Sequence, residues 1–340
     1  MNAETKPTAP AQPLLEVQNL KTYFYSREGT LRAVDGVSFT LDRGKVLGIV
    51  GESGCGKSVT SQSVLRIVPK NGEIVEGKIL LHLDDRVVDM ATLDAKGQAV
   101  LRIRGKEIAM VFQEPMTSFS PVYSVGNQIM ETLRLHQSMD KAQARAEAVR
   151  LLSIVGMPNP DTMVNAYPFE LSGGMRQRAM IAMALSCRPR LLIADEPTSA
   201  LDVTVQAQIL ELLRELMGQF NMSVMLITHD LGIVAELSDD ILIMYLGKNM
   251  EVGDVRTIFH SPKHPYTQGL LASVPKLGER EEQLVPISGS VPSLYELPRG
   301  CSFHPRCPHF MAGLCDVEEP QMYEPEPGHR VKCFLYRKEA

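Results

Sequence analysis

The chain has 340 residues, about twice the usual size of a single domain, which favours one large domain with additions or two unequal domains. Hydrophobic residues make up 44% and charged residues 22%, so the chain can bury a core and is not predicted to be disordered as a whole. The 40 acidic and 35 basic residues give a net charge of -5, so no nucleic-acid partner is expected.

No apolar run reaches the roughly 20 residues that a membrane-spanning helix needs. The longest runs are Val46–Val50 and Ala179–Leu185. Residues 1–13 are rich in Thr, Ala, Pro and Gln and lack the apolar segment of a secretion signal, so we expect a disordered tail. These features together predict a protein of the cytosol.

Residues 14–50 have the pattern of β-strands, separated by turn residues at 27–29 and 42–44, and predict a small antiparallel sheet. The last of these strands, Val46–Val50, is a continuous apolar run that stops at Gly51. Such a run is typical of a buried parallel strand that leads into a loop.

Helices are expected in the next part of the chain. One should run from Lys57 to about Val68. Residues from about 114 to 170 form a helical insert, in which Asp140 can cap a helix over Lys141–Val155.

Strands then alternate with helices. Apolar strands at Leu191–Ala194 and Val224–Thr228 follow helices at Gly174–Cys187 and Val205–Phe220. This alternation predicts a mostly parallel sheet with helices on both faces. Past about residue 260 the periodicity fades, so we expect a small, loop-rich C-terminal extension over 261–340.

The octet at residues 51–58, GESGCGKS, matches the phosphate-binding loop pattern in full and lies between an apolar strand and a helix. Its glycines let backbone N–H groups surround phosphate oxygens, while Lys57 reaches the β- and γ-phosphates and Ser58 coordinates magnesium. A glycine-rich turn without a ligand is the alternative. The predicted ATP-binding residues here are Gly51, Glu52, Ser53, Gly54, Cys55, Gly56, Lys57, Ser58 and Val59.

A second motif, Leu191–Glu196, is an apolar strand that ends in two carboxylates. Asp195 would hold the hydrated magnesium ion, and Glu196 would polarise the water that attacks the γ-phosphate. A solvated acidic turn is the alternative for this pair alone. The phosphate-binding loop in the same chain disfavours that alternative.

Upstream of this strand, Leu171–Gln177 reads LSGGMRQ and resembles the signature of ABC ATPases, with Met where Gln is more usual. The resemblance extends over nearly the whole chain. Gln113 is similar to the Q-loop glutamine, Asp202 to the D-loop aspartate and His229 to the switch histidine. The resemblance implies a catalytic set of Lys57, Gln113, Glu196 and His229. It also implies magnesium ligation by Ser58, Gln113 and Asp195.

An aromatic ring should stack on adenine in this family, and Phe24 stands at the corresponding position, with Tyr23 and Tyr25 as alternatives in register. The signature opens a helix, whose N-terminus is an anion site. Since the chain has a phosphate loop for its own nucleotide, the resemblance implies that a second subunit's ATP occupies this site. The residues expected to contact ATP in trans are Ser172, Gly173, Gly174 and Gln177.

The resemblance implies an α/β P-loop ABC ATPase cassette over residues 14–260, with a mostly parallel sheet, an antiparallel β subdomain and the helical insert. Within the extension, HPYTQGLL at residues 264–271 and GCSFHPRC at residues 300–307 resemble the ATPase subunits of bacterial dipeptide and oligopeptide importers. Nickel importers share part of this pattern. We therefore expect ATP hydrolysis that powers peptide import, with a nickel or other small-solute importer as the alternative.

A non-transport ABC ATPase of DNA repair or translation is the rival of another class, disfavoured because the insert is short and the chain has one cassette. The importer resemblance implies four partners: a second ATPase subunit, usually a paralogue, two membrane permeases and an extracytoplasmic solute-binding protein. The expected location is peripheral, at the cytoplasmic face of the cell membrane.

Four of the six cysteines lie among the last forty residues with the spacing C-x5-C-x7-C-x17-C, at Cys301, Cys307, Cys315 and Cys333. In a reducing cytosol, clustered thiols indicate a metal more than disulfides. Thiolates suit zinc or an iron–sulfur cluster. The resemblance to importer ATPases with the same cysteine set implies a 4Fe–4S cluster, with zinc or unliganded thiols as alternatives. Because this segment has few apolar side chains, we expect the metal to stabilise it.

Overall fold

The computed structural model describes residues 13–114, 118–199, 201–273 and 287–337. The expected disordered tail therefore lies outside the described residues except for Pro13, which begins strand β1. Ala200 of the expected D-loop also lies outside them.

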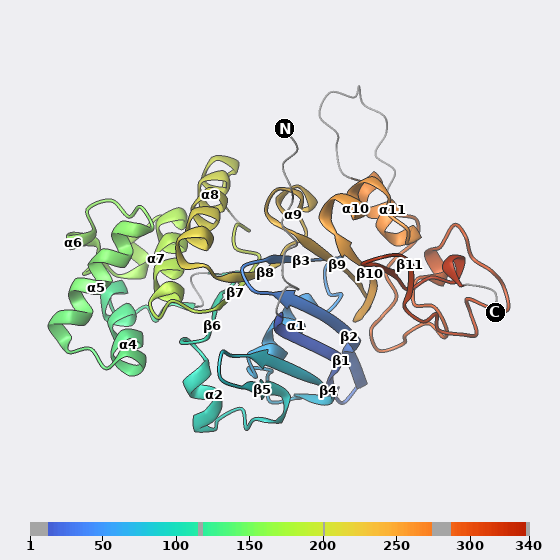
Figure 1. Ribbon diagram of the computed structural model, residues 1–340, viewed down its shortest axis with the longest axis horizontal. Helices are drawn as coiled ribbons and strands as arrows, with labels where there is room; N and C mark the ends of the chain where they lie inside the picture. The colour runs from blue at the N-terminus through green and yellow to red at the C-terminus, as the bar shows by residue number, and fades with distance from the viewer. Residues whose placement is uncertain (1–12, 115–117, 200, 274–286, 338–340) are drawn as a thin grey trace, which may run out of the picture.

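The central sheet of the described chain has the strand order β11-β12-β10-β9-β3-β8-β7-β6 (Figure 1). The five strands from β9 to β6 run parallel. Their bounds are β3 Val46–Val50, β6 Ile108–Val111, β7 Leu191–Asp195, β8 Ser223–Ile227 and β9 Asp240–Tyr245. All residues of β3, β7 and β8 are buried, because helices or a second sheet cover both faces, and this explains their continuous apolar runs.

A second, antiparallel sheet has the order β2-β1-β4-β5. Its strands are β1 Pro13–Ser26, β2 Gly29–Asp42, β4 Gly72–His82 and β5 Val87–Asp89. The stretch before the predicted turn at residues 27–29 forms one strand, β1. The pairing register shifts between Val17 and Leu20, where Asn19 has a φ of 47°, so a bulge interrupts the alternation without ending the strand.

Helix α1, Lys57–Val64, packs between the two sheets. It ends four residues before the predicted end near Val68. Arg66 adopts a left-handed φ of 58°, and the N–H groups of Arg66 and Ile67 donate to the carbonyls of Ser63 and Gln62. This bonding pattern ends a helix. It could not be predicted from the sequence, because Gly or Asn usually occupies the left-handed position that Arg66 takes here.

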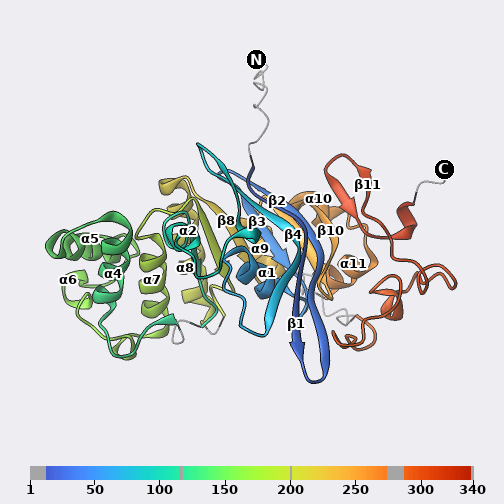
Figure 2. The same cartoon turned by 90° about the horizontal axis from the view of Figure 1, so that it is seen from below.

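The helical part lies at one end of the molecule, and the C-terminal extension lies at the other (Figure 2). Asp140 caps α5 in a reciprocal capping box with Gln143, as the sequence indicates. The helices of this part are α4 Val125–Gln137, α5 Lys141–Ile154, α6 Pro160–Met163 and α7 Gly173–Leu185.

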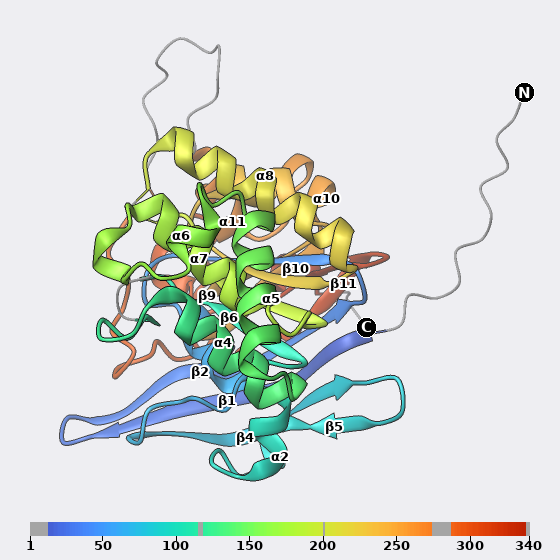
Figure 3. The ribbon, with the colours of Figure 1, turned by 90° about the vertical axis from the view of Figure 1, so that its left-hand side faces the viewer.

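Other helices cover the face of the central sheet that is opposite the antiparallel sheet (Figure 3). They are α8 Val203–Phe220, α9 Leu231–Leu237 and α10 Val255–His260. The short helix α2, Gln98–Ile103, precedes β6 and was not predicted. In the described residues, no helix combines the length and hydropathy that crossing a bilayer requires.

The C-terminal extension is joined to the central sheet and is less loop-like than predicted. Strand β12, His329–Val331, pairs with β10, Lys248–Asp254, and with β11, Tyr323–Glu326. A further helix, α11, spans Pro265–Ala272, and a 3-10 turn, η3, spans His304–Arg306.

An aromatic cluster holds the extension against the cassette. The ring of Tyr245 at the end of β9 lies 4.7 Å from that of Tyr266 and 5.4 Å from that of Phe303, centre to centre, and all three side chains are fully buried. The extension thus packs on apolar side chains of the cassette in addition to its own.

Candidate active site

The phosphate loop follows β3 and leads into α1. Gly54 and Gly56 have φ values of 78° and 102°, which residues other than glycine rarely adopt. A Cβ on Gly56 would lie 2.2 Å from the carbonyl oxygen of Ala33, so glycine is required there. Gly56 is also the N-cap of α1 and places no side chain over its first N–H groups. The loop therefore leaves the positive end of the helix open to an anion.

A cavity of about 450 Å³ lies beside this loop. Parts of the chain that are far apart in sequence line it: the antiparallel sheet, the phosphate loop, the residues that follow the carboxyl ends of β6 and β7, and the extension. The lining residues are Phe24, Ser26, Leu31, Ala33, Ser53, Gly54, Gly56, Lys57, Ser58, Val59, Asn71, Gln113, Glu196, Leu294 and Tyr295.

Of the three consecutive aromatic residues, only Phe24 lines the cavity. The hydroxyl of Tyr23 instead donates to Asp35 at 2.7 Å, and burial together with this bond raises the pKa of Tyr23 to about 12. Tyr25 is 49% exposed on the antiparallel sheet. This arrangement favours Phe24 for a stacking role and disfavours its two neighbours.

Lys57 is buried, and its ammonium group donates to the carbonyls of Gly51 at 2.8 Å and Glu52 at 3.1 Å. Cys55 lies beneath it, with Sγ 3.8 Å from Nζ, and burial raises the pKa of this thiol. The ammonium is thus held at the loop, where it can exchange carbonyl partners for phosphate oxygens.

Ser58 and Asp195 meet at the end of β7, where the hydroxyl of Ser58 donates to the carboxylate at 3.2 Å. Burial raises the pKa of Asp195, and the bond from Ser58 opposes this shift. A cation would favour the ionised carboxylate, and oxygen ligands are those that magnesium prefers. These two residues therefore fit the predicted magnesium site.

Glu196 is held between two other predicted catalytic residues. Its Oε2 accepts a hydrogen bond from Gln113 Nε2 at 2.9 Å, and its Oε1 lies 3.3 Å from His229 Nδ1. Its backbone has a left-handed φ of 46° and donates to Ile227 at 2.8 Å. Non-glycine residues in this conformation often belong to functional sites. Tertiary structure thus brings together Gln113, Glu196 and His229, which are far apart in the sequence.

Comparison with known proteins supplies the family. The profile of the family described as "ABC transporter" matches residues 34–199, and that described as "Oligopeptide/dipeptide transporter, C-terminal region" matches residues 250–315. The chain is 48% identical over 328 residues to the oligopeptide transport ATP-binding protein AppD of Bacillus subtilis, with 96% of this chain and 98% of that protein covered. The chain belongs to the ABC transporter ATP-binding proteins.

A second relative of this ABC ATPase is the dipeptide transport ATP-binding protein DppD of Bacillus subtilis, 47% identical over 330 residues, with 97% of this chain and 96% of that protein covered. Among solved structures, a dimeric bacterial ABC transporter cassette, MJ0796, is 25% identical and superposes with a TM-score of 0.62 over 71% of this chain and 99% of that chain. The predicted ABC cassette fold and the predicted ATPase activity coupled to transport are confirmed.

The signature of this ABC ATPase lies at the start of α7. Ser172 caps the helix by accepting from the N–H of Met175 at 3.3 Å, and Ser172 and Gly173 are exposed. Neither residue lines the cavity beside the phosphate loop of the same chain. The side chain of Gln177, also predicted to contact ATP in trans, is only 2% exposed, unlike that of Ser172, and its Nε2 has no hydrogen-bond partner among the described residues. Asp202 caps α8 by accepting from Val205 N–H at 3.0 Å.

The four cysteines of the extension share one neighbourhood. Burial, with a smaller contribution from the nearby cysteines, raises the pKa of Cys301 to about 11 and that of Cys333 to about 12. The N–H of Cys301 also donates to the carbonyl of Cys315 at 2.8 Å. Within the described residues, however, no three side chains of His, Cys, Asp or Glu are grouped as ligands of one metal ion.

Sequence reasoning missed the contribution of the extension to this site. Leu294 and Tyr295 line the cavity, and Arg306 pairs with Glu52 of the phosphate loop. The side chain of Glu52 therefore points to the extension and does not line the cavity. The aromatic and arginine residues of the extension could not be assigned to the site because their contacts are far away in sequence.

Proposed function

We propose that this ABC ATPase hydrolyses ATP at the cavity beside β3 and that this hydrolysis powers peptide import. The observation that carries the proposal is the position of Glu196, which is held between Gln113 and His229 next to the Ser58–Asp195 pair. A carboxylate oriented in this way beside a phosphate loop is suited to accept a proton from water.

In the proposed reaction, water forms a bond to the γ-phosphorus while the bond from this phosphorus to the bridging oxygen of ADP breaks. Glu196 accepts the proton that the water loses, and His229 orients the carboxylate. Lys57 and the N–H groups at the start of α1 compensate the phosphate charge. Ser58, Asp195 and Gln113 would hold magnesium, which supplies charge neutralisation at the β- and γ-phosphates.

The site is proposed to be completed by a second ATPase subunit, which the importer resemblance makes a paralogue. Ser172 and Gly173 are exposed at the N-terminus of α7 and lie outside the cavity of their own chain. A helix N-terminus with free N–H groups suits the γ-phosphate held by a partner. The remaining proposed partners are two permeases and a solute-binding protein, with the ATPase peripheral at the cytoplasmic face of the cell membrane.

Peptide is the proposed solute because the extension matches the oligopeptide/dipeptide transporter region and both relatives named above are peptide transport proteins. The decisive experiment compares uptake of a labelled dipeptide, a labelled tetrapeptide and nickel in cells with and without this chain. Loss of peptide uptake alone supports the proposal. Loss of nickel uptake alone would move the assignment to a metal importer, and unchanged uptake of all three would contradict an importer role.

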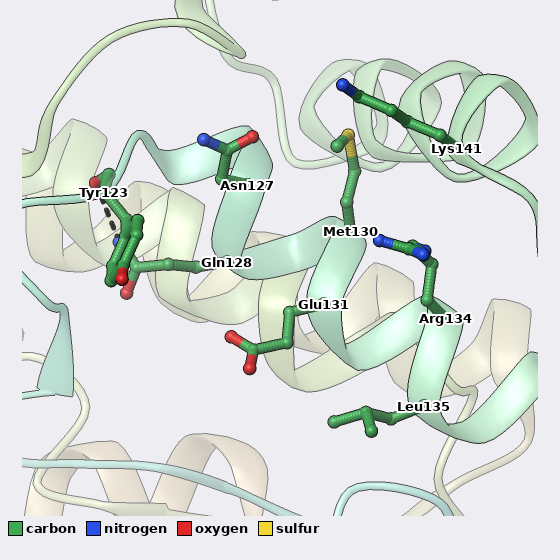
Figure 4. Close-up of a pocket in the computed structure, with 8 residues that line it drawn as sticks. All are labelled: Tyr123, Asn127, Gln128, Met130, Glu131, Arg134, Leu135 and Lys141. Atoms are coloured by element: carbon green, nitrogen blue, oxygen red, sulfur yellow. Dashed lines mark hydrogen bonds between the residues drawn. The ribbon is translucent and has the colours of Figure 1, made fainter.

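A groove on the helical part is the proposed docking site for a permease segment (Figure 4). It has a volume of about 710 Å³. The residues that line it come soon after Gln113 in the sequence, so a permease bound there could respond to the γ-phosphate through Gln113. Leu135 is 73% exposed and Tyr123 is 57% exposed, so both side chains are available to a partner at this groove. The groove is lined by Tyr123, Asn127, Gln128, Met130, Glu131, Arg134, Leu135 and Lys141.

Replacement of Leu135 by Asp is expected to lower peptide transport by at least about tenfold, because a charge would be desolvated at the interface. ATP binding by the isolated chain should not change. The matched control is Val317→Asp, which changes a 66% exposed valine of the extension. Transport that falls with Val317→Asp but not with Leu135→Asp would place the permease on the extension and refute the groove.

We also propose that the four cysteines of the extension ligate a 4Fe–4S cluster, with zinc as the runner-up. Their shared neighbourhood and their spacing support this, and four thiolates are the usual ligand set. Ligation would require the thiols to deprotonate and move closer together than they lie in this structure. The proposed role is structural.

Protein purified without oxygen should be brown and contain about four irons per chain. Cys315→Ser should remove the iron and leave nucleotide binding measurable, because Cys315 lies outside the ATP cavity. Cys187→Ser, at a half-buried thiol of the helical part, is the control that should keep the iron. One equivalent of zinc in a colourless protein would favour the runner-up, and a folded extension without metal would exclude both.

A further inference from the structure

Arg306 of the extension forms a two-pronged ion pair with Glu52 of the phosphate loop. Its Nη1 lies 2.7 Å from Glu52 Oε2, and its Nη2 lies 3.1 Å from Glu52 Oε1. The Arg306 side chain is only 4% exposed, whereas the Glu52 side chain is 26% exposed. Paired hydrogen bonds of this kind have a fixed geometry, which lysine cannot reproduce.

The guanidinium is itself held on all sides. Its other N–H groups donate to the carbonyls of Ser288 at 3.1 Å and Ile287 at 3.5 Å and to the hydroxyl of Tyr245 at 3.3 Å. Its carbon also lies 5.7 Å from the ring centre of Tyr245 and 6.0 Å from that of Phe303. All five N–H donors of arginine thus have acceptors, so the position of this charge is set by the extension.

Every polar group of Glu52 is engaged as well. Its N–H donates to the hydroxyl of Tyr266 at 3.0 Å, and its carbonyl accepts from Lys57 Nζ at 3.1 Å and from the N–H of Cys55 at 3.2 Å. A continuous set of contacts therefore runs from Arg306 through Glu52 to Lys57, the residue proposed to bind phosphate. A carboxylate released from this ion pair would stand unneutralised in a loop that must accept a polyanion.

We propose that Arg306 is a positioning residue for the ATPase reaction: it holds the Glu52 carboxylate away from the phosphates and keeps the phosphate loop in its nucleotide-binding form. The C-terminal extension thereby sets the nucleotide affinity of the cassette. This inference rests on the proposed ATPase site. It assigns to the extension a function in nucleotide binding, in addition to its packing on the central sheet.

The test measures the Kd of MgATP and of MgADP, and kcat and KM, for the full chain, for four variants at Arg306 and Glu52, and for one control variant. Arg306→Met should weaken nucleotide binding by about tenfold and raise KM similarly, while kcat at saturating ATP stays within about threefold, because Arg306 touches no reacting atom. The nucleotide affinity of Arg306→Lys should lie between those of wild type and Arg306→Met, since lysine keeps the charge but cannot form both hydrogen bonds to Glu52.

The third variant, Glu52→Gln, removes the repelling carboxylate and is the reference against which the double variant is compared. In the fourth, the double variant Glu52→Gln/Arg306→Met, most of the affinity lost in Arg306→Met should return. This rescue distinguishes a positioning role from a purely structural one. If Arg306 only stabilised the fold, removal of Glu52's charge as well would not restore nucleotide affinity. Arg337→Met, which removes a 55% exposed partner of Glu318, is the matched control.

Wild-type affinity in Arg306→Met, or losses that add up in the double variant, would overturn the proposal. If Arg306→Met does not fold, Arg306→Lys carries the test, and equal Kd values for MgATP in Arg306→Lys and wild type would overturn the proposal. A wild-type chain that hydrolyses no ATP would instead refute the proposed function, so the two failures are distinguishable.

Discussion

Replacement of Glu196 by Gln is expected to slow ATP hydrolysis by at least about 100-fold, because a positioned general base commonly contributes that much or more. The amide has the shape of the carboxylate and can keep a hydrogen bond to Gln113, which lies 2.9 Å away. It cannot accept the proton of the attacking water. Nucleotide affinity should be unchanged, and an ATP-bound dimer should accumulate.

For Glu196→Gln, phosphate release measures the rate of hydrolysis, nucleotide titration measures the affinity, and light scattering in MgATP measures dimer accumulation. The control is Glu211→Gln, which changes a 58% exposed carboxylate on α8 that pairs with Arg214. Turnover at the wild-type rate in Glu196→Gln would exclude Glu196 as the base. A loss of nucleotide binding in the same variant would show that the residue has a structural role in the cavity.

The Lys57→Ala variant should behave differently, with nucleotide affinity lower by about 10- to 100-fold. A hydrogen bond from a charged group contributes about 1.5–3 kcal/mol, and Lys57 is proposed to donate to phosphate in the ground state as well as in the transition state. The variant also leaves the carbonyls of Gly51 and Glu52 without this donor, so the loop should become less ordered.

Equilibrium titration with a fluorescent nucleotide distinguishes Lys57→Ala from Glu196→Gln. Lys21→Ala, at a lysine that pairs with Glu76 on the antiparallel sheet, is the matched control and should bind nucleotide normally. Unchanged affinity in Lys57→Ala would mean that the ammonium keeps its two carbonyl partners when nucleotide binds. The proposed role of Lys57 would then be wrong.

Motifs whose physics is local could be identified from the sequence. The phosphate loop needs glycines at left-handed positions between a strand and a helix, and Gly54 and Gly56 adopt such positions. Helix caps are local as well: Asp140 caps the predicted helix, and Ser172 caps the signature helix. Buried parallel strands were visible as apolar runs because both of their faces are covered.

Contacts between distant segments were decided by the tertiary structure, because they depend on strand order and packing that no local pattern encodes. The choice of Phe24 over its tyrosine neighbours follows from how β1 faces the cavity. Gln177 belongs to the signature in sequence but is buried in the fold. The early end of α1 depends on Arg66, whose guanidinium bonds to the carbonyl of Leu93.

The extension shows most clearly which features the sequence determines and which only the tertiary structure determines. Its sequence carries the family resemblance and the cysteine spacing, which are properties of the chain alone. Its attachment does not follow from them, because β12 pairs with β10 across a long sequence separation and the rings of Tyr266 and Phe303 pack on Tyr245. Arg306 and Glu52 could become partners only after this packing had brought the extension to the phosphate loop, since 254 positions separate them in the sequence.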